Sequence, residues 1–266
     1  MQSESLVKIR EMLKLRSFIT IEHLDGFGRE EFLALATSCE AAQRFDDMVL
    51  ILLEYLATLA PSSKLEDEER TLLSQGFKGI VQPLRQGILS LLESSKEENL
   101  TEKLRNGMLL LRRKLISELE IICQVFIEIA NELVLLESAF QDADAIIWAY
   151  KTIGDHRRYE AEIREDGSEE RSNAKELAEA AFSQGYSEAQ IKLAPTSLLR
   201  LSLALNYACF CYEIMKDETK ARTIAQDAID AAETEITSLG VPQSSLYATD
   251  RIIHLIRKTM EQWKRG

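Results

Sequence analysis

The feature that most constrains this chain is an apolar residue at every third or fourth position along almost its whole length. Met48, Ile51, Leu52, Tyr55 and Leu56 show this spacing clearly. The period places apolar side chains on one face of an α-helix, and no segment has the alternation that is typical of a strand. The 266 residues include only 11 glycines and 4 prolines, so few residues favour turns. The sequence therefore predicts an all-α fold.

Short breaks divide the chain into about nine or ten predicted helices of ordinary length. They are rich in Gly, Pro, Ser and acidic residues, which favour turns, and they lie at 25–28, 60–69, 94–99, 164–172, 193–197 and 239–245. Because short connections favour antiparallel neighbours, we expect a stack of helix hairpins. Residues 1–27 are expected to form an N-terminal helical extension whose role is open, and residues 28–266 the main domain.

The charge balance argues against several kinds of partner and site. The 44 acidic residues outnumber the 32 Lys and Arg residues, so the formal net charge is -12, which repels nucleic acid and anionic membranes. No uninterrupted apolar run reaches the roughly 18 residues of a membrane helix, and the first residues contain no signal-peptide core. The four cysteines lack the paired spacing of a zinc or redox site. We expect a cytoplasmic protein without metal or cofactor.

Two basic residues share one predicted helix face. Lys78 and Arg85 are seven residues apart, which stacks them two turns apart on the same side of a helix. Two cations so placed repel each other unless an anion lies between them. This pair is therefore either a solvated basic stripe or part of an anion site, and the spacing alone favours the solvated stripe.

A second basic cluster lies at residues 151–159. Arg158 is followed by Tyr159 and preceded at seven residues by Lys151. Arg binds phosphate oxygens in pairs, Tyr donates a hydrogen bond and Lys adds a point charge, so the set suits a phosphoryl group. The alternative is that these cations pair with Asp155 and Glu162 on the same helix.

An otherwise apolar segment, residues 203–214, carries two polar residues seven apart, Asn206 and Glu213. Polar groups on one side of such a helix need partners. They are either members of a satisfied core network or groups that bind the main chain of an extended peptide, and their spacing does not distinguish the two.

Five strings in the same order resemble the 14-3-3 family, and together they extend from about Ser38 to Trp263. They are QRFDDM (43–48), DEERTLLSQGFK (67–78), SELEIIC (117–123), KTIGDHRRY (151–159) and RLSLALNYACFCYEI (200–214). The resemblance implies an antiparallel bundle of about nine helices. It also implies a groove for phosphopeptides and a dimer formed through the N-terminal helices.

The resemblance assigns functions to individual residues. The phosphate ligands would be Lys78, Arg85, Arg158 and Tyr159. The peptide groove would contain Lys151, Leu205, Asn206, Glu213, Ile252, Leu255, Thr259 and Trp263. The dimer would be held by ion pairs between the two chains, in which Arg44 pairs with Glu118 and Asp47 pairs with Lys114.

The last predicted helix departs from the family pattern. Thr259 stands where the family has its second peptide-binding asparagine, and Arg251 and Gln262 replace apolar groove residues. Leu111 also replaces a tyrosine of the dimer interface. Because a hydroxyl cannot donate and accept toward a peptide group as a carboxamide does, we expect an altered sequence preference.

We therefore expect an adaptor that binds phosphoserine or phosphothreonine segments of client proteins. It would act as a homodimer, with heterodimers possible, and with one groove per subunit. The alternative is a helical scaffold for unphosphorylated segments, although the chain has no 34-residue repeat. Catalysis is not expected, because the chain contains no HExxH, GxSxG, P-loop or GxGxxG motif.

Overall fold

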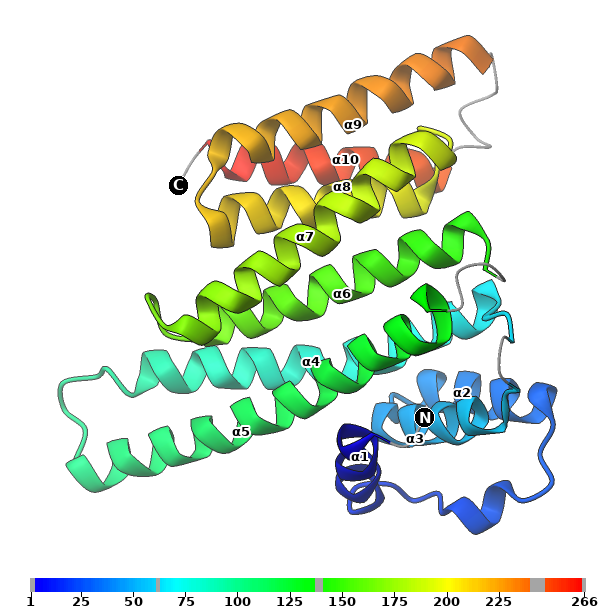
Figure 1. Cartoon of the computed structure of the whole chain (residues 1–266). Helices are drawn as coiled ribbons and strands as arrows, with labels where there is room; N and C mark the ends of the chain where they lie inside the picture. The colour runs from blue at the N-terminus through cyan, green and yellow to red at the C-terminus, as the bar shows by residue number, and fades with distance from the viewer. Residues whose placement is uncertain (1–2, 61–62, 137–140, 240–246, 265–266) are drawn as a thin grey trace. The chain divides into compact units, whose positions relative to one another are not determined.

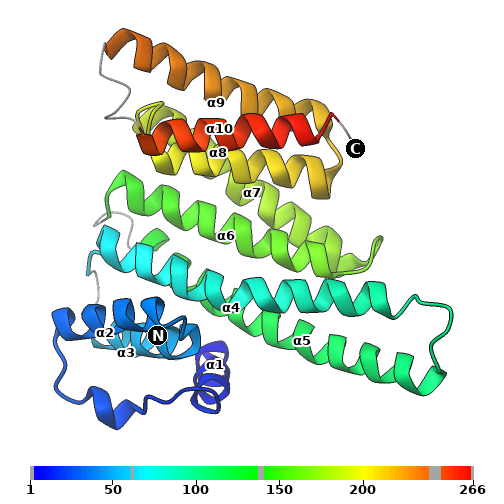
Figure 2. The same cartoon turned by 180° about the vertical axis from the view of Figure 1, so that it is seen from behind.

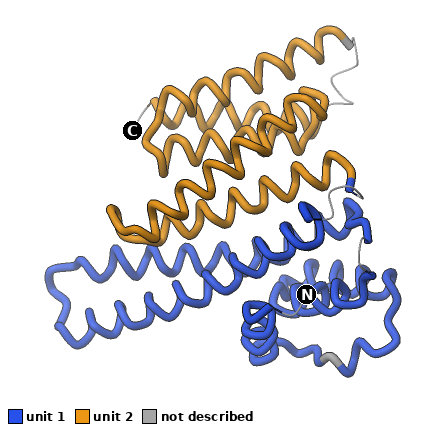
Figure 3. The backbone as a smooth tube through the Cα atoms, viewed as in Figure 1, with its two compact units in different colours: residues 1–141 blue, residues 142–266 orange. Residues whose placement is uncertain are grey.

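The computed structural model describes residues 3–60, 63–136, 141–239 and 247–264. The chain divides into two compact units, residues 1–141 and 142–266 (Figure 3). All regular elements over the described residues are helices, and no strand occurs among them. This confirms the predicted all-α fold.

The first unit is built from two helix hairpins and an N-terminal helix (Figure 1). α2 and α3 form the short hairpin, α4 and α5 form the long one, and α1 packs against α3 and α5. Phe77 of α4 stacks on Phe126 of α5 with ring centroids 4.1 Å apart. The elements are α1 (Glu4–Lys14), η1 (Ile21–Leu24), α2 (Arg29–Ala41), α3 (Phe45–Thr58), α4 (Asp67–Ser94), α5 (Glu102–Ile129) and η2 (Ala130–Leu135).

The second unit pairs α6 with α7 and places α8, α9 and α10 side by side (Figure 2). Its core contains many alanines, which allow the helices to approach closely, together with large residues such as Phe182 and Phe210. The elements are α6 (Ala143–Ile163), α7 (Glu169–Lys192), α8 (Leu198–Phe210), η4 (Cys211–Met215), α9 (Glu218–Leu239) and α10 (Tyr247–Gln262).

The continuous stretch of α8 and η4 is long and apolar. Leu198–Met215 has a mean hydropathy of 1.2, and its length and composition alone would also suit a membrane span. Its largest apolar residues are, however, packed in the core of the second unit, where Leu203 and Phe210 are completely buried. The stretch is therefore a core helix of this unit, and it carries the half-buried Asn206 and the exposed Glu213.

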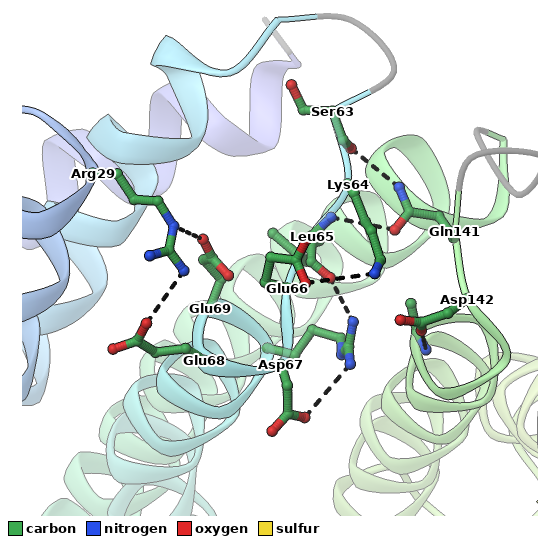
Figure 4. A network of polar contacts seen from close by, with 12 residues as sticks. Arg29, Ser63, Lys64, Leu65, Glu66, Asp67, Glu68, Glu69, Gln141 and Asp142 are labelled. Atoms are coloured by element: carbon green, nitrogen blue, oxygen red, sulfur yellow. Dashed lines mark hydrogen bonds and ion pairs between the residues drawn. The ribbon is translucent and has the colours of Figure 1, made fainter.

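Polar contacts anchor the beginning of α4 (Figure 4). Arg29 of α2 donates a hydrogen bond from Nε to Glu69 at 2.7 Å and from Nη2 to Glu68 at 3.2 Å. Just before the helix, the Leu65 N–H donates to Oε1 of Gln141 at 3.2 Å. These contacts hold the first turn of the helix that carries two of the predicted phosphate ligands.

Close packing of α6 on α7 depends on a glycine. A Cβ atom on Gly154 would lie 2.7 Å from the ring of Phe182, which is completely buried. Carbon atoms do not approach this closely without displacement, so the absence of a side chain at Gly154 sets the distance between the two helices. The next residue along α6 is Asp155, the centre of the site described below.

We expect Gly154→Ala to lower the free energy of unfolding by about 1–3 kcal/mol, because the added methyl group overpacks this contact. Gly107→Ala is the matched control. It lies inside α5 with nothing within 4 Å of its Cβ position, so it should instead gain up to about 1 kcal/mol from helix propensity. Urea unfolding followed by circular dichroism measures both changes, and a neutral Gly154→Ala would contradict the proposed packing constraint.

Candidate functional site

A buried carboxylate, Asp155 of α6, gathers three of the predicted site residues. Its side chain accepts hydrogen bonds from Lys151 Nζ at 2.8 Å and from Arg158 Nη2 at 3.2 Å. The Asn206 Nδ2 of α8 donates to both carboxylate oxygens, at 2.9 and 2.8 Å. Asp155 is only 5% exposed. The structure therefore joins α6 and α8 through one acidic group.

The charged groups of this cluster stabilise one another. Burial alone would raise the pKa of Asp155, but the neighbouring cations Lys151 and Arg158 lower it to about 2. Burial disfavours the charged form of Arg158, yet Asp155 and Tyr159 outweigh this effect and raise its pKa. Glu162 is a second anion near Arg158 and also raises the pKa of that residue. The two cations of the cluster suit an anionic ligand that binds beside Asp155.

Arg158 is held in place from a second side. Its guanidinium lies over the ring of Tyr159 with 4.6 Å between Cζ and the ring centroid. The Tyr159 ring in turn makes an edge contact with the His156 ring at 5.4 Å. An arginine whose rotamer is fixed by stacking and by an ion pair loses little conformational entropy when it binds a ligand.

The imidazole of His156, which contacts the Tyr159 ring, is buried and neutral. It is 6% exposed, and its Nδ1 lies 2.8 Å from the Thr152 carbonyl oxygen. The hydrogen bond requires the proton on Nδ1, because a carbonyl oxygen only accepts. Burial lowers the pKa of His156 from 6.5 to about 4.

This shift predicts a pH dependence of stability. Between pH 6.5 and about pH 4 the unfolded His156 takes up a proton and the folded one does not. Since the unfolded state then binds more protons, the free energy of unfolding should fall by about 3 kcal/mol across that window. His156→Gln should flatten this part of the profile, while His254→Gln on the exposed side of α10 should leave it unchanged. Chemical denaturation at a series of pH values measures the slopes, and equal slopes in both variants would contradict the assignment.

The predicted groove residues of α8 and η4 differ in exposure. Leu205 is partly buried against the core of the second unit, and Asn206 is half-buried and bonded to Asp155. Glu213, on η4, is exposed. Of the two polar residues in this stretch, Asn206 therefore belongs to a polar network, whereas Glu213 faces outward.

The predicted groove residues of α10 recur along one side of the helix. Ile252 is partly buried against the core, and the side chain of Leu255 is 48% exposed. Thr259 donates its hydroxyl hydrogen to the Leu255 carbonyl at 2.9 Å. The donor of this threonine is thus used within the helix, which agrees with the expected loss of a carboxamide contact. Trp263 is 7% exposed and stacks on Tyr212 at 4.7 Å, so most of the indole belongs to the core.

The other two predicted phosphate ligands belong to the first unit. Lys78 of α4 is exposed, and Arg85, two turns later, is half-buried. Lys78 lines a cleft of about 450 Å³ in this unit, together with Glu40, Phe45, Gln75, Gly79, Gln82, Pro83 and Gln86. Among the described residues no group of His, Cys, Asp and Glu could hold a metal ion.

Three of the four predicted dimer residues have partners within this chain. Arg44 donates from Nε to Asp47 at 2.7 Å, although the two were predicted to bind different residues of a second chain. Glu118 pairs with Arg16, and the distance between Arg16 Nη2 and Glu118 Oε2 is 2.8 Å. Lys114 is exposed.

Two features of these sites were missed by reasoning from the sequence. Asp155 was considered only as a competing ion-pair partner, not as the group that positions Lys151, Arg158 and Asn206. Its spacing of four and three residues from Lys151 and Arg158 was the available signal. The second feature is Arg16, whose partner Glu118 is 102 residues away and leaves no signal in local spacing.

Comparisons with known proteins agree with this picture. The family model of the 14-3-3 protein matches residues 35–264. The chain is 32% identical to the 14-3-3-like protein GF14 phi of Arabidopsis thaliana over 88% of this chain and 86% of that protein. It is 32% identical to the 14-3-3-like protein B of Nicotiana tabacum, covering 88% and 91%. The chain therefore belongs to the 14-3-3 family, as a divergent member of a group of non-enzymatic adaptors.

Proposed function

We propose that this protein is a cytoplasmic adaptor that binds phosphoserine or phosphothreonine segments of client proteins. The observation that carries the proposal is the cluster around Asp155, in which two cations share one buried anion and Arg158 is fixed by Tyr159. A phosphoryl group brings about -1.5 to -2 charge near neutral pH. It would be attracted by the two cations of the cluster and bind the Arg158 guanidinium through paired hydrogen bonds.

Family membership extends this proposal to other residues. It assigns Lys78 and Arg85 of α4 to phosphate binding. It assigns Asn206 and Glu213 to the peptide main chain and a flanking side chain. The exposed Leu255 offers an apolar contact to a residue next to the phosphate. Thr259, whose hydroxyl is bonded within α10, would contribute little, so the preference around the phosphoresidue should differ from that of relatives with asparagine there.

The proposed assembly is a homodimer with one groove per subunit, and heterodimers with related chains would use the same face. Two grooves in one particle would raise the avidity for a client with two phosphosites by about 100-fold or more. Nucleic acid and anionic membranes are not proposed as partners, because the net charge of -12 repels both.

Fluorescence polarisation of a labelled peptide of the type Arg-Ser-x-pSer-x-Pro tests the proposal, with its unphosphorylated twin as the control. We expect saturable binding of the phosphorylated peptide and at least about 100-fold weaker binding of the twin, because phosphate contacts dominate such interfaces. Equal affinity for both peptides would replace this proposal with that of a scaffold for unphosphorylated segments.

A further inference from the structure

The residues before α2 form a separate arm that is packed on α3 and α5. The face of α1 that meets these helices consists of Leu6, Ile9 and Leu13, which are 2%, 0% and 0% exposed. Their spacing of three and four residues makes α1 amphipathic. The arm, residues 3–27, thus packs the apolar face of α1 against α3 and α5 of the first unit.

Ion pairs hold α1 and the residues just after it. Arg10 of α1 binds Glu54 of α3 at 2.9 Å. Just after the helix, Arg16 makes a two-pronged contact with Glu118 of α5, and its Nη1 lies 3.9 Å from Asp46 of α3. The arm therefore supplies cations to an acidic face, which adds specificity to the apolar contact.

The backbone of the arm also uses Asp47. Oδ1 of this buried carboxylate accepts hydrogen bonds from the N–H groups of Phe18 at 2.8 Å and Ile19 at 3.2 Å. Arg44 donates to the Arg16 carbonyl at 3.0 Å and lies over the Phe18 ring at 4.1 Å. The arm thus contacts Arg44, Asp47 and Glu118, three of the four groups assigned to the dimer.

We propose that the arm is an intramolecular plug of the dimer face, so that two copies of this chain pair only after their arms leave. This inference rests on the proposed dimer. Arg16 binds Glu118, which in the proposed dimer would bind Arg44 of a second chain. Asp47 is bonded to the arm and to Arg44 of its own chain, so it is not available to Lys114 of a second chain. The second copy is the occupant that fits the face beneath the arm, because it would bring the same pairing groups.

The plug would weaken dimerisation by lowering the fraction of chains whose arm is open. Each copy must open its arm before it can pair, so the apparent dissociation constant of the dimer rises by the inverse of the open fraction for each chain. If about one arm in ten is open, the dimer is about 100-fold weaker than it would be without the arm. A helix as short as α1 is not stable alone, so a competitor for the arm or a modification of it would be enough to release the face.

The test compares full-length charge-reversal variants by sedimentation velocity over a wide concentration range. Arg10→Glu with Arg16→Glu turns two attractive contacts into repulsive ones and should open the arm. Lys8→Glu with Lys14→Glu is the matched control. These lysines of α1 carry the same charge, but over the described residues their ion pairs are with Glu4 and Glu11 of α1 itself. Hydrogen exchange of the Phe18 and Ile19 amides reports independently whether the arm has left Asp47.

We expect the wild type and control to dimerise at least tenfold more weakly than the arginine variant, which should also show faster exchange at both amides. Adding Lys114→Glu, an exposed change on the same face, should weaken the dimer of the arginine variant. If the wild type, the lysine control and the arginine variant dimerise equally, the plug is overturned but the proposed dimer is not. The same holds if the wild type is a dimer that dissociates when the arm opens. If hydrogen exchange shows that the arm is released and the chain still remains monomeric, both the plug and the proposed dimer are overturned. The adaptor proposal is tested separately, by the phosphopeptide affinity of each subunit.

Discussion

Replacing Arg158 with Ala is expected to weaken phosphopeptide binding by roughly 100-fold, because the variant loses the paired, charge-assisted contact to the phosphate. Arg158 has its side chain only 12% exposed and is oriented by Asp155 and by Tyr159. A free arginine on the surface would cost more entropy to immobilise, so the preorganised position concentrates the binding energy in this residue. Fluorescence polarisation gives the affinity, and circular dichroism checks that the helices are intact.

Arg157→Ala is the matched control for this effect. Arg157 is the neighbouring residue of α6, carries the same charge and pairs with Glu160 at 2.8 Å rather than with Asp155. We expect its removal to change the affinity by less than about threefold, as for a charge that steers but does not contact the ligand. Equal losses in the two variants would mean that only the general positive charge of α6 matters, and the assignment of Arg158 would fail.

Replacing Asp155 with Asn is expected to lower the free energy of unfolding by about 3 kcal/mol, because it leaves two partly buried cations without their buried shared anion. The substitution preserves the size of the side chain, so the loss reports charge rather than packing. Asp166→Asn is the control, since this carboxylate is 93% exposed although it also pairs with an arginine. That change should stay within about 0.5 kcal/mol.

The Asp155→Asn variant also tests whether the cluster takes part in phosphopeptide binding. A bound phosphate would supply the negative charge that the carboxylate no longer provides, so saturating phosphopeptide should raise the melting temperature of the variant at least as much as that of the wild type. Urea unfolding and thermal melts with and without peptide measure both effects. A variant that is as stable as the wild type would show that Asp155 does not hold the two cations together.

Much of the helical pattern was predictable because it depends on local periodicity and turn residues. The predicted break at 60–69 overlaps the connection between the end of α3 at Thr58 and the start of α4 at Asp67, and its last three residues form the beginning of α4. The breaks that were not predicted include those after α2 and after η4. There Gln43 and Lys216 adopt left-handed backbone angles, with φ of 54° and 61°. Long side chains seldom occupy this region, so neither residue carries the glycine signal by which helix ends are recognised.

The sequence singled out the basic and amide residues of the candidate site, but it did not predict the carboxylate that joins them. Spacing and family resemblance singled out Lys151, Arg158 and Asn206, and the structure joins these three through Asp155. The joining carboxylate was missed because Asn206 is 51 residues away along the chain, and only the packing of α8 on α6 brings it near. The contacts of the arm were unpredictable for the same reason, and the matched family region begins only at residue 35.

The phosphate's own titration tests the central claim most directly. Phosphorus NMR of the phosphopeptide, free and saturated with protein, follows the second pKa of phosphoserine, which is about 6 in the free peptide. Contact with Arg158 and Lys151 stabilises the dianion, so this pKa should fall to about 5 or below in the complex. A bound phosphate that titrates as it does in the free peptide would contradict the claim, because it would show a peptide held by contacts that do not involve the cations around Asp155.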